Sequence, residues 1–145
     1  RVNQAIETVY NGLRIRPKDP VLLNNLGMCW VVRRDYEKAL EMFTTAAGIM
    51  PENARYRANM AVALALMDRY EESLSLFKQI LPEHQASHNL CVIREVRKNA
   101  KLASAAKSDT LDLADTTKAR GKVLDLFSAN SKLVLSNTQE TADKE

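Results

Sequence analysis

The chain has 145 residues, of which 46% are hydrophobic and 27% charged, and this balance is typical of one globular domain. The longest apolar run, Met60 to Met67, is well short of the length that crosses a bilayer, so we expect no membrane span. The net charge is +3 and the basic residues are dispersed, which favours solvated helix faces over a nucleic-acid surface.

The first predicted element is a helix over residues 2 to 16. Its apolar residues recur at helical spacing, and Pro17 ends the pattern. They are Ala5, Ile6, Val9, Tyr10, Leu13 and Ile15. By its register with the unit that follows, this is the second helix of a pair whose first helix is missing. We therefore expect the chain to be a processed or excised piece of something longer.

Residues 20 to 53 read as one complete helix–turn–helix unit. Asp19 is placed to cap a first helix from Val21 to Arg33, and a second helix from Tyr36 to Met50 is closed by Pro51. The first helix carries Leu23-x-x-Leu26-Gly27-x-x-Trp30, and the second carries Ala39-x-x-x-Phe43-x-x-Ala46. Glycine and alanine at these positions predict that the two helices approach closely.

The same letters recur at a spacing of 34 residues, which indicates a repeating array. Thirty-four residues after Leu26, Gly27, Tyr36, Ala39, Leu40 and Phe43 stand Met60, Ala61, Tyr70, Ser73, Leu74 and Phe77, respectively. Thirty-four residues before Pro51 and Ala39 stand Pro17 and Ala5. The next unit, residues 54 to 83, is shortened because Pro82 arrives early. A terminal helix is then expected from His84 to Lys98, with Cys91 in the glycine position.

This pattern resembles the tetratricopeptide-repeat motif, with Trp30 standing where the motif usually has tyrosine. The resemblance implies an all-α fold, a solenoid of antiparallel helix pairs with a C-terminal helical or disordered extension. The array would cover residues 1–98, as a partial repeat (1–19), two repeats (20–53 and 54–83) and a terminal helix (84–98).

Residues 99–145 fall outside that pattern. We expect a polar linker, a short amphipathic segment at about 121–135 and a disordered tail. The apolar residues of the segment have two possible places. They could pack on the end of the array as a cap, which we favour because solenoids need closed ends, or they could enter a groove and mimic the natural ligand.

The resemblance also implies a concave groove that holds a peptide or an amphipathic helix of another protein. The positions implied to face it are Val21, Asn24, Asn25, Met28, Val32, Arg55, Asn59, Val62, Leu66, His88, Asn89 and Val92, with Val31 and Val96 beside them. Asn25, Asn59 and Asn89 occupy one equivalent position. Their amides could bond either to the backbone of a ligand or to neighbouring helices.

The sequence shows no arrangement of residues that would support catalysis, and we expect no cofactor. His84, His88, Cys91 and Glu95 share one helical face but extend too far along it to surround one metal ion. Cys29 and Cys91 show no metal-ligand spacing, so we expect two free thiols that are at least partly buried.

We therefore predict a non-catalytic adaptor or scaffold that binds another protein, with oligomers possible through the exposed ends of the array. The alternative is a regulatory or capping domain of a larger, possibly enzymatic, protein.

A second resemblance concerns the alanine-rich stretch from Arg57 to Leu66 and the Asp68-Arg69-Tyr70 that follows it. This stretch is similar to the repeats of bacterial tight-adherence (Flp) pilus assembly proteins. That similarity implies an accessory subunit of a pilus or secretion machine. The sequence does not choose between a cytoplasmic and a bacterial periplasmic or envelope-associated location.

Overall fold

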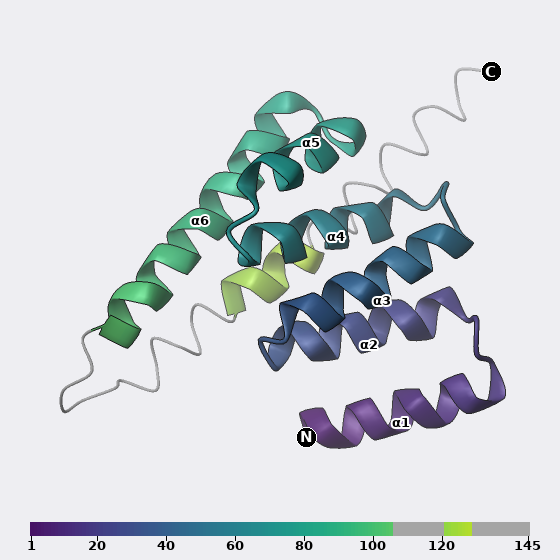
Figure 1. Ribbon diagram of the computed structural model, residues 1–145. Helices are drawn as coiled ribbons and strands as arrows, with labels where there is room; N and C mark the ends of the chain where they lie inside the picture. The colour runs from purple at the N-terminus through teal and green to yellow at the C-terminus, as the bar shows by residue number, and fades with distance from the viewer. Residues whose placement is uncertain (106–120, 129–145) are drawn as a thin grey trace, which may run out of the picture.

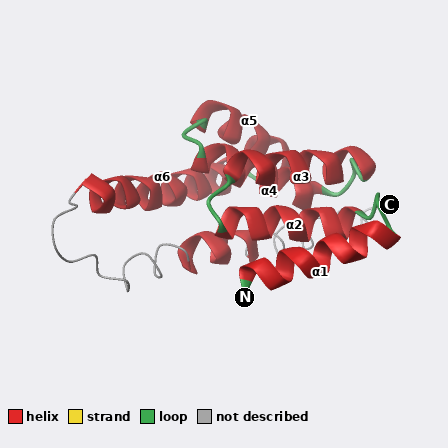
Figure 2. Cartoon of the chain, turned by 60° about the horizontal axis from the view of Figure 1, so that its bottom comes forward, coloured by secondary structure: helices red, strands yellow, loops and turns green. Residues whose placement is uncertain are grey.

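The computed structural model describes residues 1–105 and 121–128, and all of its regular elements there are helices (Figure 1). Six of them are labelled: α1 (Val2–Ile15), α2 (Pro20–Val32), α3 (Tyr36–Ile49), α4 (Ala54–Leu66), α5 (Tyr70–Ile80) and α6 (Glu83–Ala105). Residues 121–128 form one further short helix. Short loops join α1 to α6 in sequence, as Figure 2 shows.

Side-chain caps begin three of the helices, and the sequence predicts the one at Asp19. Asp19 accepts hydrogen bonds from the backbone N–H groups of Val21 and Leu22 at the start of α2. Asp35 accepts one from the N–H of Lys38 in α3, and Asn53 accepts one at the start of α4. These caps satisfy backbone donors that a helix start leaves without partners, so they fix where each helix begins.

The helices stack as antiparallel pairs, α2 with α3 and α4 with α5, while α1 packs on α2 and α6 packs on both α4 and α5. Gly27 of α2 lies against Phe43 of α3, and a Cβ atom built on Gly27 would lie 2.5 Å from Cε1 of that ring. The close approach predicted for this pair is therefore present. The predicted all-α solenoid of helix pairs is confirmed.

The last helix of the array is longer than predicted. α6 continues to Ala105 instead of ending near Lys98, so residues 99–105 are helical and are not part of a linker. Alanine, lysine and leucine in this stretch have high helix propensity, and Lys101 also reaches across to Asp68. The remaining linker (106–120) and the stretch 129–145, which includes the end of the predicted amphipathic segment and the tail, lie outside the described residues.

Candidate functional site

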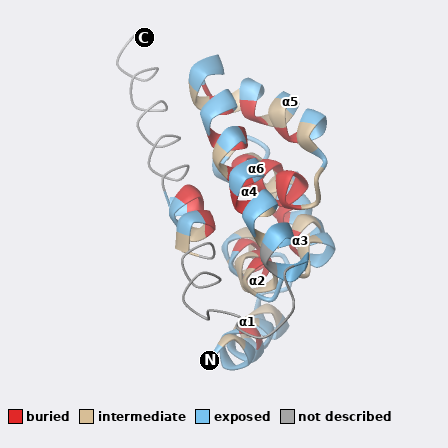
Figure 3. Ribbon diagram, turned by 90° about the vertical axis from the view of Figure 1, so that its left-hand side faces the viewer, coloured by how far each residue is buried: buried red, intermediate tan, exposed pale blue. Residues whose placement is uncertain are grey.

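The C-terminal helix at 121–128 is amphipathic and lies against the array. Val123, Leu126 and Phe127 are 7%, 8% and 3% exposed, whereas Lys122 and Asp125 point to solvent. The buried residues follow the i, i+3, i+4 spacing of one helical face. Figure 3 shows buried and exposed positions on opposite sides of this helix.

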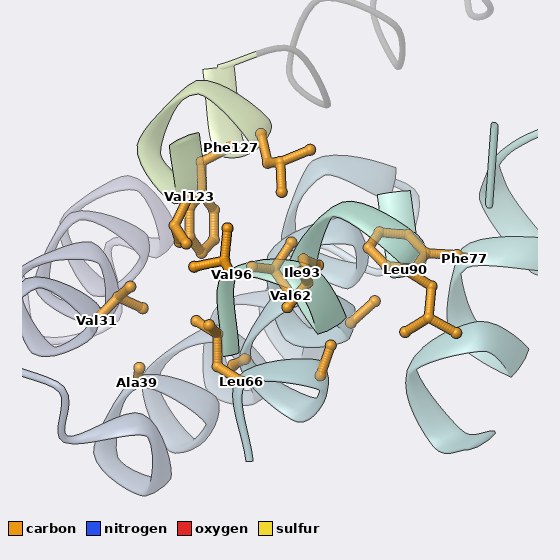
Figure 4. Close-up of a cluster of buried hydrophobic side chains, with 14 of the residues drawn as sticks. Val31, Ala39, Val62, Leu66, Phe77, Leu90, Ile93, Val96, Val123 and Phe127 are labelled. Carbon is orange, nitrogen blue, oxygen red and sulfur yellow. The ribbon is translucent and has the colours of Figure 1, made fainter. Parts of the chain in front are cut away.

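The buried face of this helix rests on side chains from the first helix of each unit. Val31 of α2, Val62 and Leu66 of α4, and Ile93 and Val96 of α6 belong to the same hydrophobic cluster as the three buried residues of the segment (Figure 4). We call the surface formed by these five residues the inner groove. The chain's own segment 121–128 therefore occupies the inner groove.

Phe127 is the least exposed of the three buried residues of the segment. Its ring centroid lies 6.0 Å from that of Phe43, with the two ring planes tilted by 40°, which is a favourable arrangement for two aromatic rings. Phe43 is itself fully buried beside Gly27. The segment is thus joined to the core between α2 and α3. Our expectation that it would cap the end of the array is wrong for residues 121–128.

A cavity remains beside the N-terminal end of the docked segment. Its volume is about 290 Å³. Its apolar lining consists of Val31, Val32, Tyr36, Leu66, Val96, Ala100, Val123 and Leu124. The side of the cavity also includes two basic residues, Arg34 and Arg97, which complete the lining among the described residues. The cavity therefore combines an apolar interior with positive charge.

The residues predicted to line a groove divide into two sets in the structure. Val62 and Leu66 are buried in the same cluster as the segment, Met28 and Val92 are partly buried against that cluster, and Val32 lines the cavity. The other apolar or charged positions, Val21, Arg55 and His88, are exposed and belong to neither the cluster nor the cavity.

The asparagines do not share one environment. Asn25 is exposed, but Asn24 and Asn59 are 4% and 2% exposed, and the Nδ2 group of Asn59 donates a 2.6 Å hydrogen bond to Oδ1 of Asn24. Asn89 is also buried. For Asn59, whose amide bonds to Asn24 of the neighbouring helix α2, the structure supports the interpretation that the amide bonds to a neighbouring helix.

Asp68 ties α6 to the turn between α4 and α5. It accepts hydrogen bonds from Arg97, Lys101 and the hydroxyl of Tyr70. These donors, Arg97 first, hold the pKa of the Asp68 carboxyl well below its usual range. Asp68 has a positive φ of 64°, a conformation that aspartate and asparagine tolerate better than most residues. The contacts of Asp68 with Arg97 and Lys101 therefore hold in place the part of α6 that lines the cavity.

Sequence reasoning did not identify Arg34, Arg97 or Ala100 as cavity residues. The spacing of Val123, Leu126 and Phe127 did predict an apolar helical face, but spacing alone carries no information about which surface that face covers.

The described residues offer little for other chemistry. They contain no group of three histidine, cysteine or acidic residues that could hold a metal ion, and none of their helices is long and apolar enough to cross a membrane. Both cysteines are free. Partial burial raises the pKa of the Cys29 thiol, whereas Cys91 is exposed, contrary to our expectation of two partly buried thiols.

Comparisons with known proteins agree with this architecture. Residues 31–90 match the tetratricopeptide repeat family. The human protein named Superkiller complex protein 3 is 26% identical over 83 residues, which is 57% of this chain but only 5% of that protein's length. No solved structure gives a significant match. The repeat motif, the stacked helix pairs and the family match together show that residues 31–90 are tetratricopeptide repeats, a fold that generally serves protein–protein interaction.

Proposed function

We propose that this protein is a non-catalytic adaptor whose inner groove binds the apolar face of a helix from another protein. The observation that carries the proposal is the helix already lying there, with Val123, Leu126 and Phe127 buried in the groove. A surface that buries one amphipathic helix has the width and the apolar character to bury another of the same pattern.

The comparisons support the class of function but not its details. The tetratricopeptide repeat is generally a non-catalytic interaction fold. The name of the human relative describes a component of a complex, which agrees with a scaffold role for this chain. Nothing in these comparisons supports the role in pilus assembly or secretion that the stretch from Arg57 to Tyr70 implies, so that role stays an untested prediction.

A second candidate function is a repeat domain within a larger protein. Tyr10, Ile15 and Val21 are exposed large apolar residues on the side of the array formed by α1 and the start of α2. Such residues would suit contact with a further helix pair. Mass spectrometry of the native protein tests this candidate, because a polypeptide much larger than this chain is required for it.

The adaptor proposal can be tested with the full chain and a synthetic peptide. The variant Phe127→Asp would release the segment, because it places a charge where a ring is now buried. A fluorescent peptide copying residues 117–130 should then bind this variant saturably in fluorescence anisotropy. Methyl NMR signals of Val31, Val62 and Leu66 should shift on binding, which would locate the peptide in the inner groove.

The matched control is the same peptide with aspartate at the positions of Leu126 and Phe127, which should not bind. A second control peptide with Lys122→Glu changes only the solvent face and should bind like the original. Equal signals from the native and the double-aspartate peptides, or no shift of the groove methyl signals, would refute the adaptor proposal.

A further inference from the structure

The described part of the docked segment, residues 121–128, has a cavity beside it. The cavity of about 290 Å³ lies next to Val123 and Leu124, at the N-terminal end of the segment. Side chains of a helix lean toward its N-terminus. A longer helix in the same place would therefore direct residues one turn before Val123 into this cavity.

The charge around the cavity is positive. Arg34 is exposed, and its guanidinium forms no ion pair with any residue in the described ranges. Arg97 shares the single carboxylate of Asp68 with Lys101, so these four residues together carry a net positive charge. Two effects favour an acidic side chain beside this cavity: attraction to the guanidinium groups of Arg34 and Arg97, and the positive end of the dipole at the N-terminus of the bound helix.

We propose that the partner of this protein is a helix with a specific pattern, and that it displaces residues 121–128 on binding. The pattern is a large apolar residue and an acidic residue about one turn before a valine-x-x-leucine-phenylalanine sequence. The large apolar residue fills the cavity between Val31, Leu66 and Val96, and the acidic residue pairs with Arg34 and Arg97. This inference rests on the proposed function, because it names the partner of the same groove.

The chain's own sequence lacks both of these features. Ala119 and Arg120 stand four and three positions before Val123. A peptide copy of this sequence would place only a methyl group toward the cavity and would bring a third positive charge toward Arg34 and Arg97. The segment is thus a weaker version of the partner helix and can be exchanged for it. The apparent affinity for the partner is the intrinsic affinity multiplied by the fraction of chains whose groove is free, so the docked segment lowers it.

The experiment compares two peptides on two full-length chains. The first peptide copies residues 117–130, and the second carries Ala119→Leu and Arg120→Glu. On the Phe127→Asp chain, the redesigned peptide should bind at least about tenfold tighter than the copy. Both peptides should bind the wild-type chain about tenfold or more weakly than the Phe127→Asp chain, because the docked segment competes with them.

Two controls separate the specific contacts from a general charge effect. A copy peptide with Lys122→Glu changes the net charge by the same amount as Arg120→Glu, but on the solvent face, and should gain little. The chain variant Arg34→Asn, made together with Phe127→Asp, removes one guanidinium. Asparagine tolerates the positive φ of 63° at position 34. This variant should reduce the advantage of the redesigned peptide several-fold.

The outcomes distinguish this inference from the function on which it rests. If the copy peptide binds the Phe127→Asp chain but the redesigned peptide binds no tighter, the partner pattern is wrong and the adaptor function stands. If both peptides bind wild-type and Phe127→Asp chains equally well, displacement of the segment is wrong. If neither peptide binds either chain, both the inference and the proposed function are overturned.

Discussion

Gly27 provides the most direct test of how the central helix pair is packed, and the perturbation is a single methyl group in Gly27→Ala. The added Cβ would lie 2.5 Å from Cε1 and 2.8 Å from Cδ1 of Phe43. Phe43 is fully buried, and its ring also meets Phe127. The ring therefore has no free space to move into, and α2 and α3 must separate or Phe127 must shift.

Two opposing effects set the size of the change in stability. Alanine is favoured over glycine inside a helix by about 1 kcal/mol, whereas overpacking a filled core costs about 1–3 kcal/mol. Gly48 supplies the matched control, because it also lies in a helix but a Cβ added there would meet no atom within 4 Å. The free energy of unfolding of Gly27→Ala should therefore be about 1–3 kcal/mol below that of Gly48→Ala.

Urea denaturation followed by far-ultraviolet circular dichroism measures this difference for the two variants and the wild type. Combining Gly27→Ala with Phe43→Leu should recover part of the loss, because a smaller side chain leaves space for the added methyl group. Equal stabilities for Gly27→Ala and Gly48→Ala would refute the conclusion that close packing requires glycine at position 27.

Three further predictions concern single side chains. Asn24→Ala should lower the free energy of unfolding by about 1–3 kcal/mol in urea denaturation, because it removes the hydrogen-bond partner of the buried Asn59 amide. Asp68→Asn should be less stable than wild type at neutral pH. Since the folded-state pKa of Asp68 is depressed, its stabilising effect is present above the usual aspartate pKa and is lost as the pH falls below about 4. Thermal melts should show the gap in stability between variant and wild type closing over that range. A constant gap would contradict the conclusion that the hydrogen bonds from Arg97, Lys101 and Tyr70 lower this pKa. Phe127→Ala should increase amide hydrogen exchange in residues 121–128 while α3 stays protected, and unchanged exchange would show that the ring does not anchor the segment.

Much of the fold follows from the sequence alone, because the contacts that define it are local or repeat at a fixed spacing. Pro17 and Pro51 mark the ends of helices, and Asp19 and Asp35 cap the helices that follow them. The recurrence at 34 residues predicts stacked helix pairs, since one pair cannot bury its own apolar face. The caps and helix ends depend on neighbours within one or two turns, and the repeat is visible as a fixed spacing, so both can be recognised without knowing the path of the chain.

The tertiary structure alone decided which surfaces meet across long sequence separations. The spacing of Val123, Leu126 and Phe127 predicts a buried face but is the same whether that face covers the end of the array or the inner groove. The pairing of Asn24 with Asn59 likewise depends on how α2 and α4 lie side by side. The physical reason is that hydrophobic burial is not directional: an apolar face requires a surface to cover, and only the three-dimensional arrangement of the helices determines which surface that is.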